Sequence, residues 1–365
     1  MLHGLEYRQR IIINKMHKTG IWAIQGRCGK TGMEKEKLEE MGKVLTVSLF
    51  GKGDYTDIQS AIDNAGDEGA VIYIKEGVYR QRLLVDKPGI RLVGQGRVII
   101  VYGIGAVHKD FYGRPYGTFR SETVRITGRD FTAENIIFVN DAGPGNFAGQ
   151  AVAVYISADR TRFYKCRFLA NQDTIYTGNP EEAGFLCKGG LEHRQYFEDC
   201  YIEGDVDFIF GNGTVVFYRC EIHSLDRHEP EGGNNGYITA ASTRPETKYG
   251  YVFLECRITG SGQPHTVYLG RPWRDYASVV FADCEMGAHI KAEGWHNWGN
   301  PEREITSRYS EWGSSGAGGD RTGRVPWQKE MPEKERSNYT PEAILSGEDQ
   351  WKFEFADSCL QEVGA

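Results

Sequence analysis

One short pattern recurs five times in this 365-residue chain and constrains its fold more than any other feature. Each copy reads Phe, two variable residues, Cys, one polar or aromatic residue and a large apolar residue. The copies begin at Phe163, Phe197, Phe217, Phe253 and Phe281. Their cysteines are 34, 20, 36 and 28 residues apart, spacings that suit one coil of a solenoid with a loop of variable length. Residues 132–137 form an earlier relative, with asparagine in the cysteine slot.

Stacked coils share one core in which like residues lie over like, because no coil can bury its apolar side alone. Five of the eight cysteines occupy the repeated slot, and free cysteine packs as a small hydrophobic residue. We therefore interpret these cysteines as a packing ladder. No Cys-x-x-Cys pair is present, so a structural zinc site is not expected. The short apolar runs between turn residues predict an all-β fold, a parallel β-helix.

The two ends of the chain carry different patterns. Thr56 or Asp57 can cap a short helix at the N-terminal end of the coils. Thr340 followed by Pro341 predicts a second short helix, in a C-terminal helical and loop region that packs back along the solenoid. We expect three parts: an N-terminal extension over 1–43, a β-helix domain over 44–355 and a C-terminal tail over 356–365.

The charge and hydropathy of the sequence exclude two classes of binding partner. The net charge is −7 and no run of basic residues forms a tail, so no nucleic-acid partner is expected. No stretch of 18 apolar residues could span a membrane, so no membrane partner is expected. The first residues do not make a convincing signal peptide. We therefore expect a cytoplasmic protein, export by another route, or a true start at Met33 or Met41.

Two carboxylates interrupt an apolar run bounded by glycines, residues 204–211, Gly-Asp-Val-Asp-Phe-Ile-Phe-Gly. Alternation in a buried strand predicts Asp205 and Asp207 on one face and Val206 and Phe208 on the other. A carboxylate there costs free energy unless it is paired, hydrogen-bonded or used in chemistry. A lone Asp in such a strand is more often structural, so the interpretation depends on its neighbours.

A second polar motif, residues 171–176, ends the preceding coil and contains Asp173. Positions one coil apart lie about 5 Å from each other, so Asp173 and Asp207 can be neighbours on one face. Two carboxylates at that distance cannot both ionise freely, which makes one an acid and the other a base or nucleophile. The side-chain amides of Gln150 and Gln172 could hold a developing oxyanion.

A third motif, residues 269–273, Leu-Gly-Arg-Pro-Trp, is expected two coils after residues 204–211. Arg271 could fix an ionised Asp and bind an anionic substrate through two parallel hydrogen bonds. Trp273 offers a flat face of the kind that stacks on a sugar ring. Each residue alone has a structural explanation, as a surface ion pair or a core side chain. Their occurrence together in adjacent coils favours a functional site.

In this order the motifs resemble those of the pectin methylesterase (pectinesterase) family, a carbohydrate esterase family with a single-stranded right-handed parallel β-helix. The resemblance covers roughly residues 44–355. The matching motifs are residues 53–62, 74–79, 150–153, 172–176, 207–211, 269–273, 294–298 and 339–341.

The resemblance implies hydrolysis of methyl esters on galacturonan (pectin), with release of methanol and with no metal or cofactor. Asp207 matches the family nucleophile, and Asp173 matches the general acid that later acts as base. Gln150 and Gln172 match the oxyanion-stabilising glutamines. The positions that match substrate-site residues are Arg271, Trp273 and Thr118. Methyl-esterified homogalacturonan is the implied substrate of an expected monomer, and a secreted or periplasmic location is implied.

Asp205 stands where the family commonly has a small polar residue, usually threonine. A second carboxylate two residues from the nucleophile could raise the pKa of Asp207 and shift the pH optimum upward. Two other functions stay open on the residues alone. One is a β-helix lyase or glycosidase that cleaves the pectin backbone, and the other is a non-catalytic polysaccharide-binding β-helix.

Overall fold

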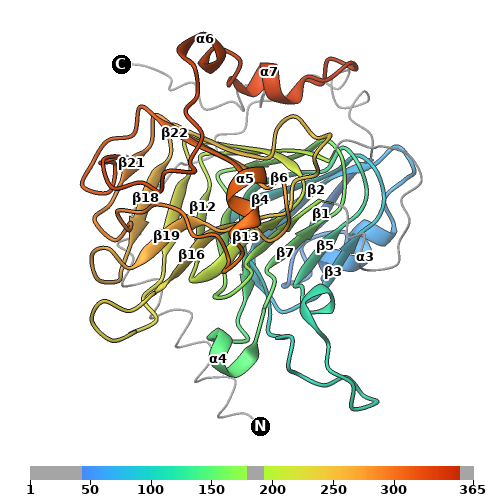
Figure 1. Ribbon diagram of the computed structural model, residues 1–365. Helices are drawn as coiled ribbons and strands as arrows, with labels where there is room; N and C mark the ends of the chain where they lie inside the picture. The colour runs from blue at the N-terminus through green and yellow to red at the C-terminus, as the bar shows by residue number, and fades with distance from the viewer. Residues whose placement is uncertain (1–42, 179–192, 354–365) are drawn as a thin grey trace, which may run out of the picture. The chain divides into compact units, whose positions relative to one another are not determined.

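The computed structural model describes residues 43–178 and 193–353 (Figure 1). Almost all of the expected extension over 1–43 and the whole of the tail over 356–365 lie outside the described residues. The described residues belong to one compact unit. No described helix is long and apolar enough to cross a membrane.

The described strands form two parallel sheets. The smaller sheet contains β3 (Leu83–Val85), β5 (Val124–Ile126), β7 (Val154–Ile156), β10 (Ile175–Thr177), β13 (Val206–Gly211), β16 (Gly236–Ala241) and β19 (Val267–Gly270). The larger sheet contains β1 (Lys43–Val47), β2 (Ala70–Tyr79), β4 (Ile90–Tyr102), β6 (Thr132–Asn140), β8 (Thr161–Tyr164), β9 (Arg167–Leu169), β11 (Arg194–Glu198), β12 (Tyr201–Gly204), β14 (Thr214–Tyr218), β15 (Glu221–Ser224), β17 (Tyr251–Leu254), β18 (Arg257–Gly260), β20 (Ser278–Ala282), β21 (Glu285–Met286) and β22 (Arg308–Trp312).

The strands wind into coils with three faces. Face 1 is the smaller sheet, and the larger sheet divides at β6 into face 2, which includes β8, β11, β14, β17, β20 and β22, and face 3, which includes β9, β12, β15, β18 and β21. Each successive coil adds one parallel strand to each face, as in β10, β11 and β12. The chain therefore has the expected right-handed parallel β-helix.

The repeated phenylalanines form a ladder through the core. Inter-strand pairing places Phe163, Phe197, Phe217, Phe253 and Phe281 in one register. Neighbouring ring centroids along this ladder are 4.7, 4.9, 4.5 and 4.3 Å apart, and the rings are stacked. The sequence repeat is therefore one structural unit per coil, and its rings fix the register between coils.

The repeat cysteines form the expected packing ladder beside the rings. All five are buried and free. The Cys166 Sγ donates to the carbonyl of Ala133 in the coil below, at 3.4 Å. Burial raises the pKa of the Cys166 thiol to about 12, so this thiol is protonated and unreactive at neutral pH.

The residue before each repeat cysteine turns the chain from face 2 to face 3. These residues all have left-handed backbone angles, with φ between 51° and 54°: Lys165, Asp199, Arg219, Glu255 and Asp283. In the earlier coil Asn135 occupies this corner with φ 55°, and Ile136 occupies the cysteine slot. The alignment of Asn135 with the cysteines is therefore wrong by one residue. The physical reason is that the corner needs a left-handed residue, which asparagine adopts readily.

Both expected capped helices are present. Helix α3 (Ile58–Asp63) begins after Asp57, whose side chain accepts a hydrogen bond from the Ser60 amide at 2.8 Å. Helix α7 (Pro341–Leu345) begins after Thr340. The remaining described helices have five residues or fewer and lack a sequence period: η1 (Thr118–Arg120), α4 (Gly145–Ala148), α5 (Glu302–Thr306) and α6 (Glu333–Arg336).

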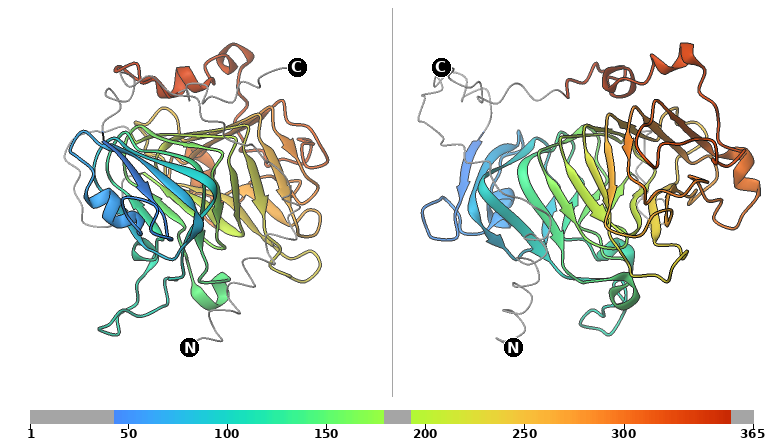
Figure 2. Two further views of the ribbon diagram at one scale, coloured as in Figure 1. Left: turned by 180° about the vertical axis from the view of Figure 1, so that it is seen from behind. Right: turned by 90° about the vertical axis from the view of Figure 1, so that its left-hand side faces the viewer.

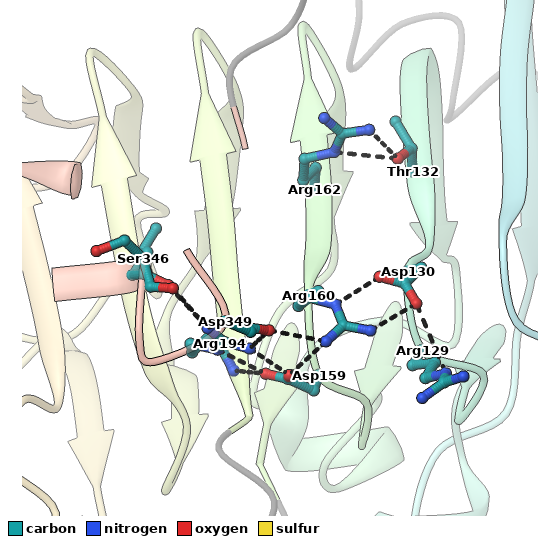
Figure 3. A network of polar contacts seen from close by, with 10 residues as sticks. Arg129, Asp130, Thr132, Asp159, Arg160, Arg162, Arg194, Ser346 and Asp349 are labelled. Atoms are coloured by element: carbon teal, nitrogen blue, oxygen red, sulfur yellow. Dashed lines mark hydrogen bonds and ion pairs between the residues drawn. The ribbon is translucent and has the colours of Figure 1, made fainter. Parts of the chain in front are cut away.

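The segment after α6 packs back over face 2, as expected from the sequence (Figures 1 and 2). Arg194 on β11 anchors it: its guanidinium donates to Asp159 at 2.7 Å, to Asp349 at 2.5 Å and to the Leu345 carbonyl at 3.1 Å. Arg160 adds a second link to Asp349 at 2.9 Å (Figure 3). The ion pairs to Asp349 and the hydrogen bond to the Leu345 carbonyl hold the end of α7 and the residues after it against the coils.

We expect Phe253→Ala to lower the free energy of unfolding by about 3–5 kcal/mol, because it leaves a cavity between two stacked rings. Urea denaturation monitored by fluorescence and circular dichroism measures this loss. Phe50→Ala is the control, since Phe50 is 82% exposed and its removal should change stability by less than about 0.5 kcal/mol. Equal effects of the two substitutions would contradict the ladder's role.

Candidate active site

Asp207 lies at a β-bulge in β13. Between Val206 and Ile209 this strand takes three residue steps where the paired strand β16 takes two. Asp207 has a left-handed φ of 51°, and Phe208 and Ile209 are both fully buried in the central core. Val206 is half-buried and outside that core. The predicted placement of Val206 and Phe208 on one face is therefore wrong, because the bulge shifts the alternation.

The two glycines that bound the motif are required by close approach. A Cβ on Gly204 would lie 2.2 Å from the Cβ of Phe208. A Cβ on Gly211, where φ is 121°, would lie 1.9 Å from the carbonyl oxygen of Thr177 in the preceding coil. Any side chain at either position would push the bulge out of register.

Asp173 lies beside Asp207 in the neighbouring coil, as predicted. Pairing of Ile175 with Ile209 puts the two aspartates at equivalent positions, and the Asp173 amide donates to the carbonyl of Val206 at 3.1 Å. Asp173 also has a left-handed φ, of 64°. Asp173 is 7% exposed and Asp207 is 6% exposed, so both carboxyl groups are removed from bulk water.

Arg271, directly after β19, holds Asp207 through two hydrogen bonds. Its Nε donates to Asp207 Oδ1 at 2.8 Å and its Nη2 donates to Oδ2 at 2.7 Å. The guanidinium lies between the rings of Tyr237 and Trp298, at 3.8 and 3.7 Å from their centroids. The predicted bidentate contact with an Asp is confirmed. The aromatic contacts fix the orientation of the cation from both sides.

These contacts separate the proton affinities of the two aspartates. Burial raises the pKa of Asp173 well above its ordinary value, and the negative charge of Asp207 raises it further. Burial also raises the pKa of Asp207, but the hydrogen bonds and charge of Arg271 oppose that rise. The arrangement therefore favours a protonated Asp173 next to an ionised Asp207.

Asp205 is buried at 3% exposure and ties two coils together. Its Oδ1 accepts a hydrogen bond from the Val206 amide at 2.7 Å, and its Oδ2 accepts one from Asn171 Nδ2 at 3.1 Å. Its charge raises the pKa of Asp207. Asp205 thus has a structural contact and an electrostatic effect on its neighbour.

Gln150 and Gln172 lie in adjacent coils next to the aspartates. The Ala151 amide donates to the carbonyl of Gln172 at 3.0 Å, and Gln172 directly precedes Asp173. Gly145 leaves room for the Gln172 side chain, since a Cβ there would lie 2.5 Å from Gln172 Oε1. Both glutamines are half-buried. Within the described part of the chain, neither side-chain amide makes a hydrogen bond, so both can donate to a ligand.

Trp273 packs at the edge of an aromatic layer on the outside of face 1. It lies 6.0 Å from Phe210 and 6.5 Å from Phe119, measured between ring centroids. It is half-buried, so part of its ring stays accessible. Thr118 begins η1 beside Phe119, and its carbonyl accepts a hydrogen bond from the Ser121 amide. The structure thus brings Trp273 to the site region and leaves Thr118 on the neighbouring turn.

Sequence reasoning missed the aromatic partners of Arg271. Trp298 lies within the motif at residues 294–298, but the sequence of that motif does not indicate its contact with Arg271. Tyr237 carries no local signal, because its contact with Arg271 is made between coils. The same holds for Phe119, which packs against Trp273. Among the residues that the structure describes, no group of three or more His, Cys, Asp and Glu side chains is arranged to hold a metal ion.

Comparisons with known proteins match most of the chain. A family model described as Pectinesterase matches residues 44–348. Pectinesterase 31 of Arabidopsis thaliana is 39% identical over 319 residues, which cover 84% of this chain and 93% of that protein.

Two solved structures are similar over most of the chain. A pectin methylesterase from carrot superposes with a TM-score of 0.73 at 33% identity, covering 86% of this chain and 98% of that chain. A pectin methylesterase in complex with a hexasaccharide also superposes with a TM-score of 0.73, at 30% identity, covering 85% of this chain and 98% of that chain.

We expect Arg271→Gln to lower the free energy of unfolding by about 3–5 kcal/mol at pH 7, because it leaves the buried Asp207 carboxylate without a counter-charge. Without Arg271 the folded-state pKa of Asp207 rises further above its unfolded value of about 3.9. The penalty is therefore present above that unfolded value and disappears as the pH falls below it. Urea denaturation at pH 7 and at lower pH measures the difference.

The double variant Arg271→Gln/Asp207→Asn is the control, because it also removes the negative charge of Asp207, which the single variant leaves buried without a counter-charge. It should be more stable than Arg271→Gln at pH 7. An equal loss for both variants, or a loss independent of pH, would show that the ion pair does not control the charge of Asp207.

Proposed function

Because this chain belongs to the pectinesterase family and is an esterase that removes methyl esters from pectin, we propose that Asp207 is its nucleophile and Asp173 its acid and base. One observation carries this assignment: Arg271 makes two hydrogen bonds to Asp207 and none to Asp173 among the described contacts. A nucleophile must be ionised and a general acid must be protonated. The cation beside Asp207 and the burial of Asp173 supply these two states.

The first half-reaction forms an acyl-enzyme. A carboxylate oxygen of Asp207 attacks the ester carbonyl carbon, and the carbonyl electron pair moves to the oxygen. Gln150 and Gln172 donate hydrogen bonds to that oxyanion. When the intermediate collapses, the bond to the methoxy oxygen breaks, Asp173 protonates the leaving group, and methanol departs. The sugar carboxyl group is then joined to Asp207 as an anhydride.

The second half-reaction restores the enzyme. Asp173, now ionised, removes a proton from water, and the hydroxide oxygen attacks the acyl carbonyl carbon. The bond to the Asp207 oxygen breaks and the carboxylate of Asp207 is regenerated. The products are methanol and a free galacturonic acid unit, whose carboxyl proton is lost to solvent. These reaction steps use only side chains of the protein. They consume one water molecule and release one methanol molecule.

The substrate proposed for this site is methyl-esterified homogalacturonan. A relative of known structure binds a hexasaccharide, and an accessible Trp273 ring beside Arg271 suits a chain of sugar units with some free carboxylates. We place the catalytic domain at residues 44–355, with Thr118 on the substrate side of η1. A monomer that acts outside the cytoplasm, where pectin occurs, is part of the proposal.

We expect the protein to release methanol from methylated pectin without shortening the chains. Asp207→Asn should reduce the turnover rate by at least about 10³-fold, because the nucleophile is lost. Gln172→Ala should reduce it by about 10²-fold through loss of an oxyanion donor. Methanol, viscosity and reducing ends are measured together. New reducing ends would favour a backbone-cleaving enzyme, and no methanol release would favour a binding protein.

We expect Asp205→Thr to move the acidic limb of the kcat/KM profile to lower pH. Asp205 raises the pKa of Asp207, and the acidic limb reports the ionisation of that nucleophile in the free enzyme. The other charged group that acts on the pKa of Asp207 is Arg271, which the substitution leaves in place. Asp205→Asn is the control of closest shape and should give a similar shift. An unmoved acidic limb in both variants would refute this role of Asp205.

A further inference from the structure

A loop and a short helix beside the active site carry aromatic side chains that the reaction does not use. Phe111 is 96% exposed and Tyr112 is 76% exposed, at the tip of residues 107–116, which we call the arm. Phe147 in α4 is also 76% exposed. The teal loop before η1 and the green helix α4 extend from the same side of the coils in both figures (Figures 1 and 2).

The arm is held in shape by its own hydrogen bonds. The Asp110 amide donates to the Arg114 carbonyl and the Tyr116 amide donates to the His108 carbonyl, both at 2.8 Å. Asp110 Oδ1 accepts hydrogen bonds from the amides of Tyr112 and Arg114, both at 3.0 Å. The exposed rings are therefore presented on a preorganised turn, and binding there would lose little chain entropy.

The base of the arm is continuous with the active site. The Val107 amide donates to the Ala148 carbonyl at 3.3 Å, and the Ala106 amide donates to the Gln150 carbonyl at 2.7 Å. Phe147 lies three residues before Gln150. A long ligand bound at Gln150 can thus pass α4 and reach the arm.

The arm also carries positive charge suited to a polyanion. Lys109 is exposed, the side chain of Arg114 is 66% exposed, and that of Arg120 in the adjacent η1 is 50% exposed. The one acid of the arm, Asp110, contacts both arginines, at 3.2 and 3.4 Å. The Arg114 guanidinium lies 5.1 Å from the centre of the Tyr112 ring. Exposed rings next to cations match a polymer that has both apolar sugar faces and carboxylates.

We propose that the arm is a second binding site for the pectin chain, which holds de-esterified, anionic galacturonate units outside the catalytic residues. The rings of Phe111 and Tyr112 pack on the apolar faces of sugar rings, and Arg114 pairs with a carboxylate. This inference rests on the proposed function, because it extends the substrate contact of that site.

The test compares the wild type with Phe111→Ala/Tyr112→Ala. Binding to fully de-esterified polygalacturonate is measured by affinity electrophoresis, and methanol release from partly methylated pectin gives KM and kcat. The double variant should bind polygalacturonate about five- to ten-fold more weakly and show a similarly raised KM with kcat unchanged within two-fold. Arg114→Gln should weaken the salt dependence of binding, because one ion pair is lost.

Phe50→Ala is the matched control, an 82% exposed aromatic residue outside the arm, and it should bind as the wild type does. Thermal unfolding of each variant shows that the fold is kept. The inference is overturned if the double variant binds polygalacturonate as tightly as the wild type, or if Phe50→Ala weakens binding equally. It is also overturned if sedimentation shows that the substitutions only break contacts between two copies of the chain. Wild-type protein that releases no methanol would instead refute the proposed function.

Discussion

The register between neighbouring coils is the constraint on which the rest of the structure depends. Stacked rings of Phe163, Phe197 and their successors hold each coil directly over the previous one. In a parallel ladder, a slip of one residue would turn every side chain to the opposite face. The two aspartates of the site come from different coils, so their separation is set by this core and not by local sequence. The same register aligns Asp173 with Asp207.

The site uses backbone conformations that the core must enforce. Asp173 and Asp207 both have left-handed backbone angles, which cost a non-glycine residue about 1 kcal/mol or more each. The bulge at Asp207 places two consecutive residues in the core and turns the carboxylate toward Arg271. Tyr237 and Trp298 then fix that arginine from both sides. Burial alone would raise the pKa of both carboxyl groups. The guanidinium makes them different, and that difference is what an acid and a nucleophile in one site require.

Much of the fold could be predicted from the sequence because each coil of a solenoid carries the same residue pattern. Five copies of one pattern report the same environment, and the caps at Asp57 and Thr340 depend only on adjacent residues. The two wrong predictions have one origin. Each applied a rule about adjacent residues at a position whose conformation is set by a contact with another coil. The sequence pattern aligns Asn135 with the cysteines, because spacing alone cannot reveal which corner position is left-handed. The alternation around Val206 failed because a bulge is defined by the partner strand.

The sequence by itself determined the coil architecture, the helix caps, and the identity of the polar residues that the coils would bring together. Their types and order were enough to indicate paired carboxylates with an arginine and amide donors. Only the tertiary structure decided which carboxylate the arginine holds, which rings hold the arginine, and that the arm presents Phe111 and Tyr112 to solvent. The physical reason is that proton affinity and exposure depend on burial, direction and distance between coils. These quantities arise from packing between residues far apart in the chain, and no local pattern carries them.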